Sequence, residues 1–213
     1  MDNAVALVQA YLRLNGYFTV VEHPIVLAQG RTGYRMATDL DVMAVRFPQA
    51  MTVAAARRPR HRATPIGPDP RLGAVGDGVD MLVGEVKEGK AVLNAAAADP
   101  RVLATALVRF GCCPPESAAD LVSDLHREGR VSLPHGHTLR LVSFGSTAPD
   151  GRHVHHVVTL DHVIGFLDRY LATNWAAIRA TGTKDPAIGL VAILRKSGMT
   201  IVGPRNRSQE ATP

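Results

Sequence analysis

The feature that constrains this chain most is an apolar strand that ends in charged residues. Residues 79–83 are apolar except for Asp80, which is typical of a buried strand. The run continues into Glu85-Val86-Lys87, and on a strand the side chains of Glu85 and Lys87 point to the same face. Burying these charges is costly unless a partner compensates them. The sequence therefore predicts a charged group or a bound ion beside this strand.

A second acidic strand precedes the first. In residues 37–47 the side chains of Asp39, Asp41 and Met43 share one face. We expect the two strands to be neighbours in a sheet, which places Asp41 close to Glu85. A hard divalent cation, Mg²⁺ or Mn²⁺, would compensate two such carboxylates. Lys87 beside it could position or help deprotonate a water, or stabilise negative charge on a phosphate.

The remaining pattern predicts an α/β fold in a single domain, residues 1–202, followed by a flexible polar tail, residues 203–213. Residues 114–130 form a helix that is either an insertion shaping a substrate groove or plain scaffold. The other expected elements are a helix at 3–15, strands at 17–27, 37–47 and 79–87, a helix at 100–110, strands at 137–145 and 152–160, and C-terminal helices at about 160–198.

This order, with Asp41 in "TDLDVMAV" and Glu85 and Lys87 in "VGEVK", resembles the PD-(D/E)XK nuclease superfamily. That superfamily has the restriction-endonuclease-like fold and includes Holliday-junction resolvases and Mrr-type enzymes. The resemblance covers residues 3–145. It implies an αβββαβ core with a mixed central sheet flanked by helices, to which the C-terminal helices are added.

The resemblance also implies an activity, a metal-dependent endonuclease that hydrolyses phosphodiester bonds, with DNA as the partner and a homodimer as the assembly. Asp41 would be the metal-binding aspartate, Glu85 the second ligand and the peptide carbonyl of Val86 a third. Lys87 would be the catalytic lysine. The alternatives are cleavage of RNA by the same residues, and a non-catalytic binding or structural protein that keeps the fold.

The sequence departs from the superfamily pattern in two places. No proline precedes Asp41, and the first helix lacks the glutamate that many members use as an accessory ligand. Gln9 or Glu22 could take that accessory role. Asp39 competes with Asp41 for the role of ligand, or serves as an accessory or turn residue.

The charge balance favours a phosphate-bearing partner. The net charge is +5, and only four of the 24 basic residues are lysines. Arginine suits phosphate contact. A long, mobile, basic loop at about 54–78 joins the two acidic strands, and it either contacts nucleic acid or is a solvated linker. Its candidate contact residues are Arg57, Arg58, Arg60 and Arg62.

Other residue groups have simpler readings. The adjacent Cys112 and Cys113 are expected to be reduced thiols that pack at a helix end. No apolar run approaches ~20 residues, and no signal peptide is recognisable, so we expect a cytoplasmic protein. Five histidines near predicted hairpins are either solvated or part of a zinc site: His135, His137, His153, His155 and His156.

Overall fold

The computed structural model describes residues 2–48, 50, 68–182 and 184–199. These residues form an α/β protein around a mixed six-stranded sheet with the order β1-β2-β3-β5-β4, and β6 pairs with β5 as well. The β3–β5 and β5–β6 pairs are parallel, and the other pairs are antiparallel. The strands are β1 (Phe18–Gln29), β2 (Gly33–Arg46), β3 (Asp80–Lys90), β4 (Arg130–Ser132), β5 (Thr138–Thr147) and β6 (His156–Thr159).

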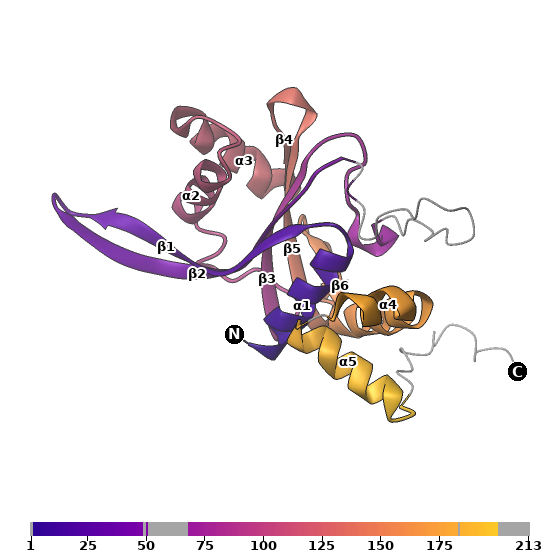
Figure 1. Ribbon diagram of the computed structural model, residues 1–213. Coiled ribbons are helices and arrows are strands. Elements are labelled where there is room, and N and C mark those ends of the chain that lie inside the picture. Colours follow the sequence, from indigo (N-terminus) through magenta and orange to yellow (C-terminus); the bar gives the residue numbers. More distant parts are fainter. Residues whose placement is uncertain (1, 49, 51–67, 183, 200–213) are drawn as a thin grey trace, which may run out of the picture.

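Helices cover both faces of this sheet (Figure 1). One face carries α1 (Asn3–Leu14), α4 (Leu160–Thr181) and α5 (Pro186–Lys196). The other carries α2 (Pro100–Phe110) and α3 (Ala118–Glu128). The sequence prediction of an α/β protein with C-terminal helices is therefore confirmed.

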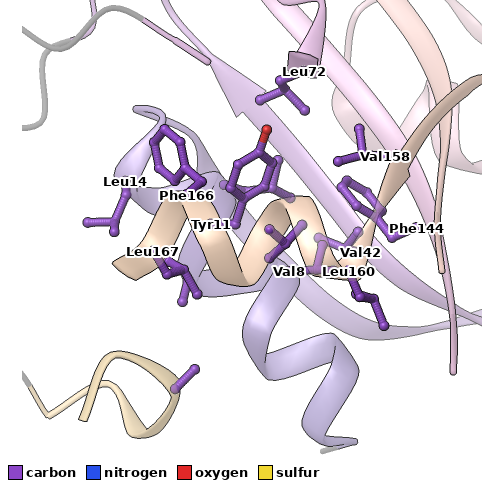
Figure 2. Packing of buried hydrophobic residues seen from close by; sticks show 14 of the residues in the cluster. Val8, Tyr11, Leu14, Val42, Leu72, Phe144, Val158, Leu160, Phe166 and Leu167 are labelled. Atoms are coloured by element: carbon purple, nitrogen blue, oxygen red, sulfur yellow. The ribbon is translucent and has the colours of Figure 1, made fainter. Parts of the chain in front are cut away.

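Successive side chains of β3 point alternately to the two faces of the sheet. Leu82 and Val86 pack in the cluster with α1 and α4. Met81 and Val83 pack in the cluster with α2 and α3. Tyr11 fills the centre of the first cluster, where its ring meets Phe166 edge-on at a centroid distance of 5.1 Å (Figure 2). Because Glu85 has the same parity as Met81 and Val83, its side chain faces the α2–α3 layer.

Local capping residues set the start of α2 and the end of α3. Asp99 caps α2 by accepting a hydrogen bond from the N–H of Arg101, with Pro100 in the first turn. Gly129 ends α3 in the left-handed conformation at φ 68°. The cap at Asp99 fixes where the chain enters α2. It therefore also fixes the end of the loop from β3 to α2 that builds the site below.

The β1–β2 hairpin extends well beyond the sheet. β1 and β2 pair as far as Gln29 and Gly33, but β2 pairs with β3 only from Val42 to Arg46. Residues 23–41 therefore form a two-stranded arm, here called the β-arm, which extends past β3 (Figure 1). Ile25 and Leu40 at its base are buried in the cluster with α2 and α3. The register shifts between Ile25 and Val26, where Ala37 of β2 has no partner on β1.

The structure also corrects parts of the prediction. The strand expected at 152–160 is regular only in β6, and the short β4 had no recognisable pattern. The described end of the expected basic loop, residues 68–78, contains a short 3-10 helix, Pro70–Leu72, with Asp69 and Leu72 buried. No described helix is both long and apolar enough to cross a membrane.

Candidate metal and catalytic site

The site begins where β2 separates from β3. Val42 pairs with Gly84, and the next pair in this register would place Asp41 opposite Glu85. Backbone pairing stops there, and the Oδ2 atom of Asp41 accepts a hydrogen bond from the N–H of Val86 at 2.7 Å. The carboxylate thus replaces the lost β-ladder partner. It is held against β3, beside Glu85.

Glu85 is buried, with 1% of its surface exposed, and its two carboxylate oxygens differ. Oε1 accepts hydrogen bonds from Lys87 Nζ and from Asn94 Nδ2, both at 2.5 Å. Oε2 is buried and has no hydrogen-bond partner. A buried carboxylate oxygen without a partner is destabilising. Oε2 is therefore the atom at which a bound cation or a hydrogen-bond donor would compensate the charge of Glu85.

Asn94 is a residue that the sequence analysis missed. Its Oδ1 accepts a hydrogen bond from the N–H of Ala97 at 2.6 Å, so its amide nitrogen must face Glu85. No regular spacing connects Asn94 to the Glu-x-Lys motif, because it lies in the irregular loop between β3 and α2. The available signal was weak: an Asn shortly before a helix is common as a turn residue.

The same loop is fixed across the end of β5. The N–H of Ala91 donates to Thr147 O at 2.9 Å, and Ser143 Oγ donates to Ala91 O at 2.8 Å. Gly145 allows this close approach, because a Cβ there would lie 2.5 Å from the nitrogen of Ala91. The loop is therefore clamped before it turns back to present Asn94 to Glu85.

The electrostatics of the site follow from its burial. Burial raises the pKa of Glu85, and the nearby charge of Asp41 raises it further, while Lys87 and Asn94 offset part of the effect. The hydrogen bond to Glu85 raises the pKa of Lys87 despite partial desolvation, and Asp41 contributes in the same direction. The two carboxylates and the ammonium therefore form one interacting group.

The donor set fits a hard divalent cation. Two carboxylates, one with an unpartnered buried oxygen, lie side by side on β2 and β3. The N–H and C=O of a strand residue point to the same edge, so the Val86 carbonyl faces the edge that Asp41 occupies. Within the described residues no group of three or more His, Cys, Asp or Glu could hold a metal, so the carbonyl would be needed as a third protein ligand.

Three other candidates from the sequence have different surroundings. Asp39 is exposed and pairs with Pro24, whereas Asp41 is the aspartate held on β3. Gln9 donates from α1 to Thr19 Oγ1 at 3.3 Å. Glu22 lies opposite Asp41 on β1, because the residues on either side of Glu22 pair with those on either side of Asp41. Its φ is positive, at 50°. This left-handed backbone is strained for a glutamate, and such strain often occurs at functional sites.

The other groups named from the sequence are placed as follows. Arg57, Arg58, Arg60 and Arg62 lie outside the described residues. His135 and His137 have ring centroids 6.2 Å apart, and those of His153 and His155 are 5.6 Å apart. Neither pair belongs to a described cluster of three or more metal-binding side chains. Both cysteines are free thiols, and burial raises the pKa of Cys112 to about 11, which suits a packing role.

Comparisons with protein-family models, curated proteins and solved structures found no match for this chain.

Proposed function

We propose that this protein is a metal-dependent endonuclease of the PD-(D/E)XK type, which hydrolyses phosphodiester bonds in DNA. The observation that carries the proposal is the buried, unpartnered Oε2 of Glu85 beside Asp41. In the buried ion pair of Asp80 with Arg140 both carboxylate oxygens accept hydrogen bonds, whereas Lys87 and Asn94 both bind Oε1 of Glu85. The spare oxygen supports a role in binding something other than this chain.

The residues divide the chemistry among them. Asp41, Glu85 and the Val86 carbonyl would hold Mg²⁺ or Mn²⁺, which when bound polarises the phosphate and lowers the pKa of a coordinated water. Hydrolysis adds water across a P–O bond of the DNA backbone. Asn94 keeps Glu85 in position through Oε1 and leaves Oε2 available.

Lys87 is the residue that can reach the reacting groups from solvent. Its side chain is 39% exposed, while that of Glu85 is 1% exposed. An ammonium that donates to Glu85 has no lone pair for a proton, so we assign Lys87 to orienting the water and stabilising charge on the phosphate. Glu85 anchors the ammonium at 2.5 Å, which limits the positions that Nζ can adopt.

The fold supports the same proposal. The chain order α1-β1-β2-β3-α2, followed by β5 parallel to β3, matches the αβββαβ order that the resemblance implies. We propose that the mixed sheet is a restriction-endonuclease-like core. In this arrangement α3 and β4 stand between α2 and β5 as an addition.

The test is an assay of the purified protein on linear, circular and branched DNA and on RNA, with Mg²⁺, with Mn²⁺ and with EDTA. We expect cleavage of DNA that requires the metal and stops in EDTA. Cleavage that survives EDTA would contradict the proposed chemistry. DNA binding without cleavage of any substrate would favour a non-catalytic protein, and cleavage confined to RNA would change the substrate.

A further inference from the structure

The β-arm is the largest feature that the proposed reaction does not use. It starts at the site, because Asp41 lies at the base of the arm on β2 and is hydrogen-bonded to β3. It ends at the turn between Gln29 and Gly33. Asp41 lies eight positions after Gly33, which corresponds to a reach of at most about 26 Å at ~3.3 Å per residue.

The part of the arm beyond its base, residues 23–38, carries charge of one sign. Residues 23–38 contain no aspartate or glutamate, although they include Arg31 near the turn and Arg35 on β2. Both arginines are exposed. The first carboxylates on either side are Glu22 and Asp39, at the base of the arm. A stretch with cations and no anions attracts a polyanion and does not pair with itself.

The two faces of the arm differ. Residues directly across the ladder share a face, so Leu27 and Arg35 lie on one face. The pKa of Asp99 is lowered to about 2, chiefly by Arg101 and to a lesser extent by Arg35. Leu27 packs against the cluster that includes α2 and α3, so Arg35 lies on the side of the arm that faces this layer, as Glu85 does.

The opposite face is apolar and exposed. Val26 lies across from Met36, and Ala28 lies across from Tyr34. The exposed fractions are 51% for Val26, 62% for Met36 and 78% for Tyr34. Side chains of this kind can contact deoxyribose, thymine methyl groups or unstacked base steps, so they suit a groove lined by phosphates.

We propose that the β-arm lies in a groove of duplex DNA and holds the duplex on one side of the scissile phosphate. A two-stranded β-ribbon fits the major groove, and a reach of about 26 Å corresponds to roughly eight base pairs at ~3.4 Å each. Arg31 and Arg35 contact phosphates on the groove walls. This inference rests on the proposed nuclease function and adds to it an extended contact with double-stranded substrate.

The test compares the wild type with a double variant that carries both Arg31→Gln and Arg35→Gln. Fluorescence anisotropy in EDTA measures binding without cleavage, on duplexes of about 8 and about 24 base pairs chosen around the arm's reach. We expect the slope of log K against log salt on the longer duplex to fall by about 1.8, at ~0.9 for each lost contact. The loss should be smaller on the short duplex, because a scissile phosphate inside it leaves fewer than ~8 base pairs on the side where the arm lies.

A matched control removes the same charge elsewhere. Arg169→Gln with Arg179→Gln takes two exposed arginines from α4, on the face of the sheet opposite Glu85. This control should keep the wild-type slope. Thermal unfolding of both double variants should match the wild type, because all four side chains are exposed.

The outcomes separate the two proposals. If the wild type cleaves DNA and the arm variant binds it with an unchanged slope, the arm inference is wrong and the nuclease proposal stands. If the wild type neither binds nor cleaves DNA, the proposed function is wrong and the inference falls with it.

A second double variant, Tyr34→Ser with Met36→Ser, tests whether the arm binds another protein chain instead. If sedimentation shows that these changes turn a dimer into monomers without altering DNA binding, the arm is a subunit interface and the inference is wrong.

Discussion

The carboxylate of Asp41 accepts a hydrogen bond from the backbone N–H of Val86 at 2.7 Å, at the point where β2 and β3 stop pairing. This one contact has two roles. It satisfies a backbone donor that lost its ladder partner, and it fixes Asp41 beside Glu85. Substitutions at Asp41 can separate the structural role from the proposed metal-binding role.

Asp41→Asn should keep the hydrogen bond, because an amide oxygen can also accept from Val86. Asp41→Ala should lose it and cost about 1–3 kcal/mol of the free energy of unfolding, since the donor is left unsatisfied. Both variants should lose metal-dependent cleavage, by at least ~100-fold. Chemical denaturation and single-turnover cleavage measure the two effects. A fully active Asp41→Asn would show that the charge of Asp41 is not needed.

Lys87→Met should reduce cleavage by orders of magnitude while DNA binding persists. Because Glu85 is buried, the loss of this partner should also lower the free energy of unfolding, by about 1.5–3 kcal/mol as for a hydrogen bond to a charged group. Lys90→Met is the matched control, because it removes an ammonium of the same strand from an exposed pair with Asp150. Equal activity of the two variants would remove Lys87 from the mechanism.

Asn94→Ala should weaken metal binding by roughly 10–100-fold, the effect expected when a residue that orients a ligand is lost. Stability should fall as well, because the N–H of Ala97 loses its acceptor. Calorimetric titration with Mn²⁺ measures the affinity. Asn94→Asp separates the roles: it keeps an acceptor for Ala97 but replaces the donor to Glu85 with a carboxylate. If it matched wild-type affinity, Asn94 would have no positioning role.

Much of this site could be predicted from local sequence. Alternation placed Glu85 and Lys87 on one face of a strand, and the capping residue Asp99 placed the following helix. Asn94 could not be predicted, because its position depends on the loop being clamped to β5 through Ala91. That clamp joins residues far apart in the chain, which local pattern does not encode.

The length over which β2 pairs with each of its neighbours also could not be predicted from the local sequence pattern. Alternation continues through β2, but it does not say that pairing with β3 stops at Val42 while pairing with β1 goes on. The buried network at the other end of β3, where Arg140 binds Asp80 at 2.8 Å, brings together residues from different strands. Its members looked like ordinary strand residues in the sequence.

The stability of the protein should fall in acid through Asp69. Burial alone would raise the pKa of this carboxyl, but His162, the N–H of Arg71 and Tyr11 donate hydrogen bonds to it, so its pKa is lowered from 3.8. A lowered pKa means that the ionised form stabilises the fold. This contribution is present above pH 3.8 and is lost as the pH falls through the folded-state value.

His162→Phe removes one of these donors and should lower the free energy of unfolding at neutral pH by about 1.5–3 kcal/mol, as for a hydrogen bond to a charged group. The acid-dependent part of the stability curve should become shallower. Urea denaturation from pH 7 down to pH 3 measures both effects, with Asp150→Asn as a control because that carboxylate is 93% exposed. If the acid-dependent part of the stability curve were unchanged, His162 would not stabilise the charge on Asp69.

The most direct test of the central claim is single-turnover cleavage of labelled DNA by wild type and Glu85→Gln in Mg²⁺. Glutamine keeps the shape of Glu85 and an oxygen that can accept from Lys87 and Asn94, but it removes the charge at the unpartnered Oε2. We expect wild-type cleavage that stops in EDTA and a rate at least ~100-fold lower for Glu85→Gln. Cleavage by Glu85→Gln at the wild-type rate would contradict the claim.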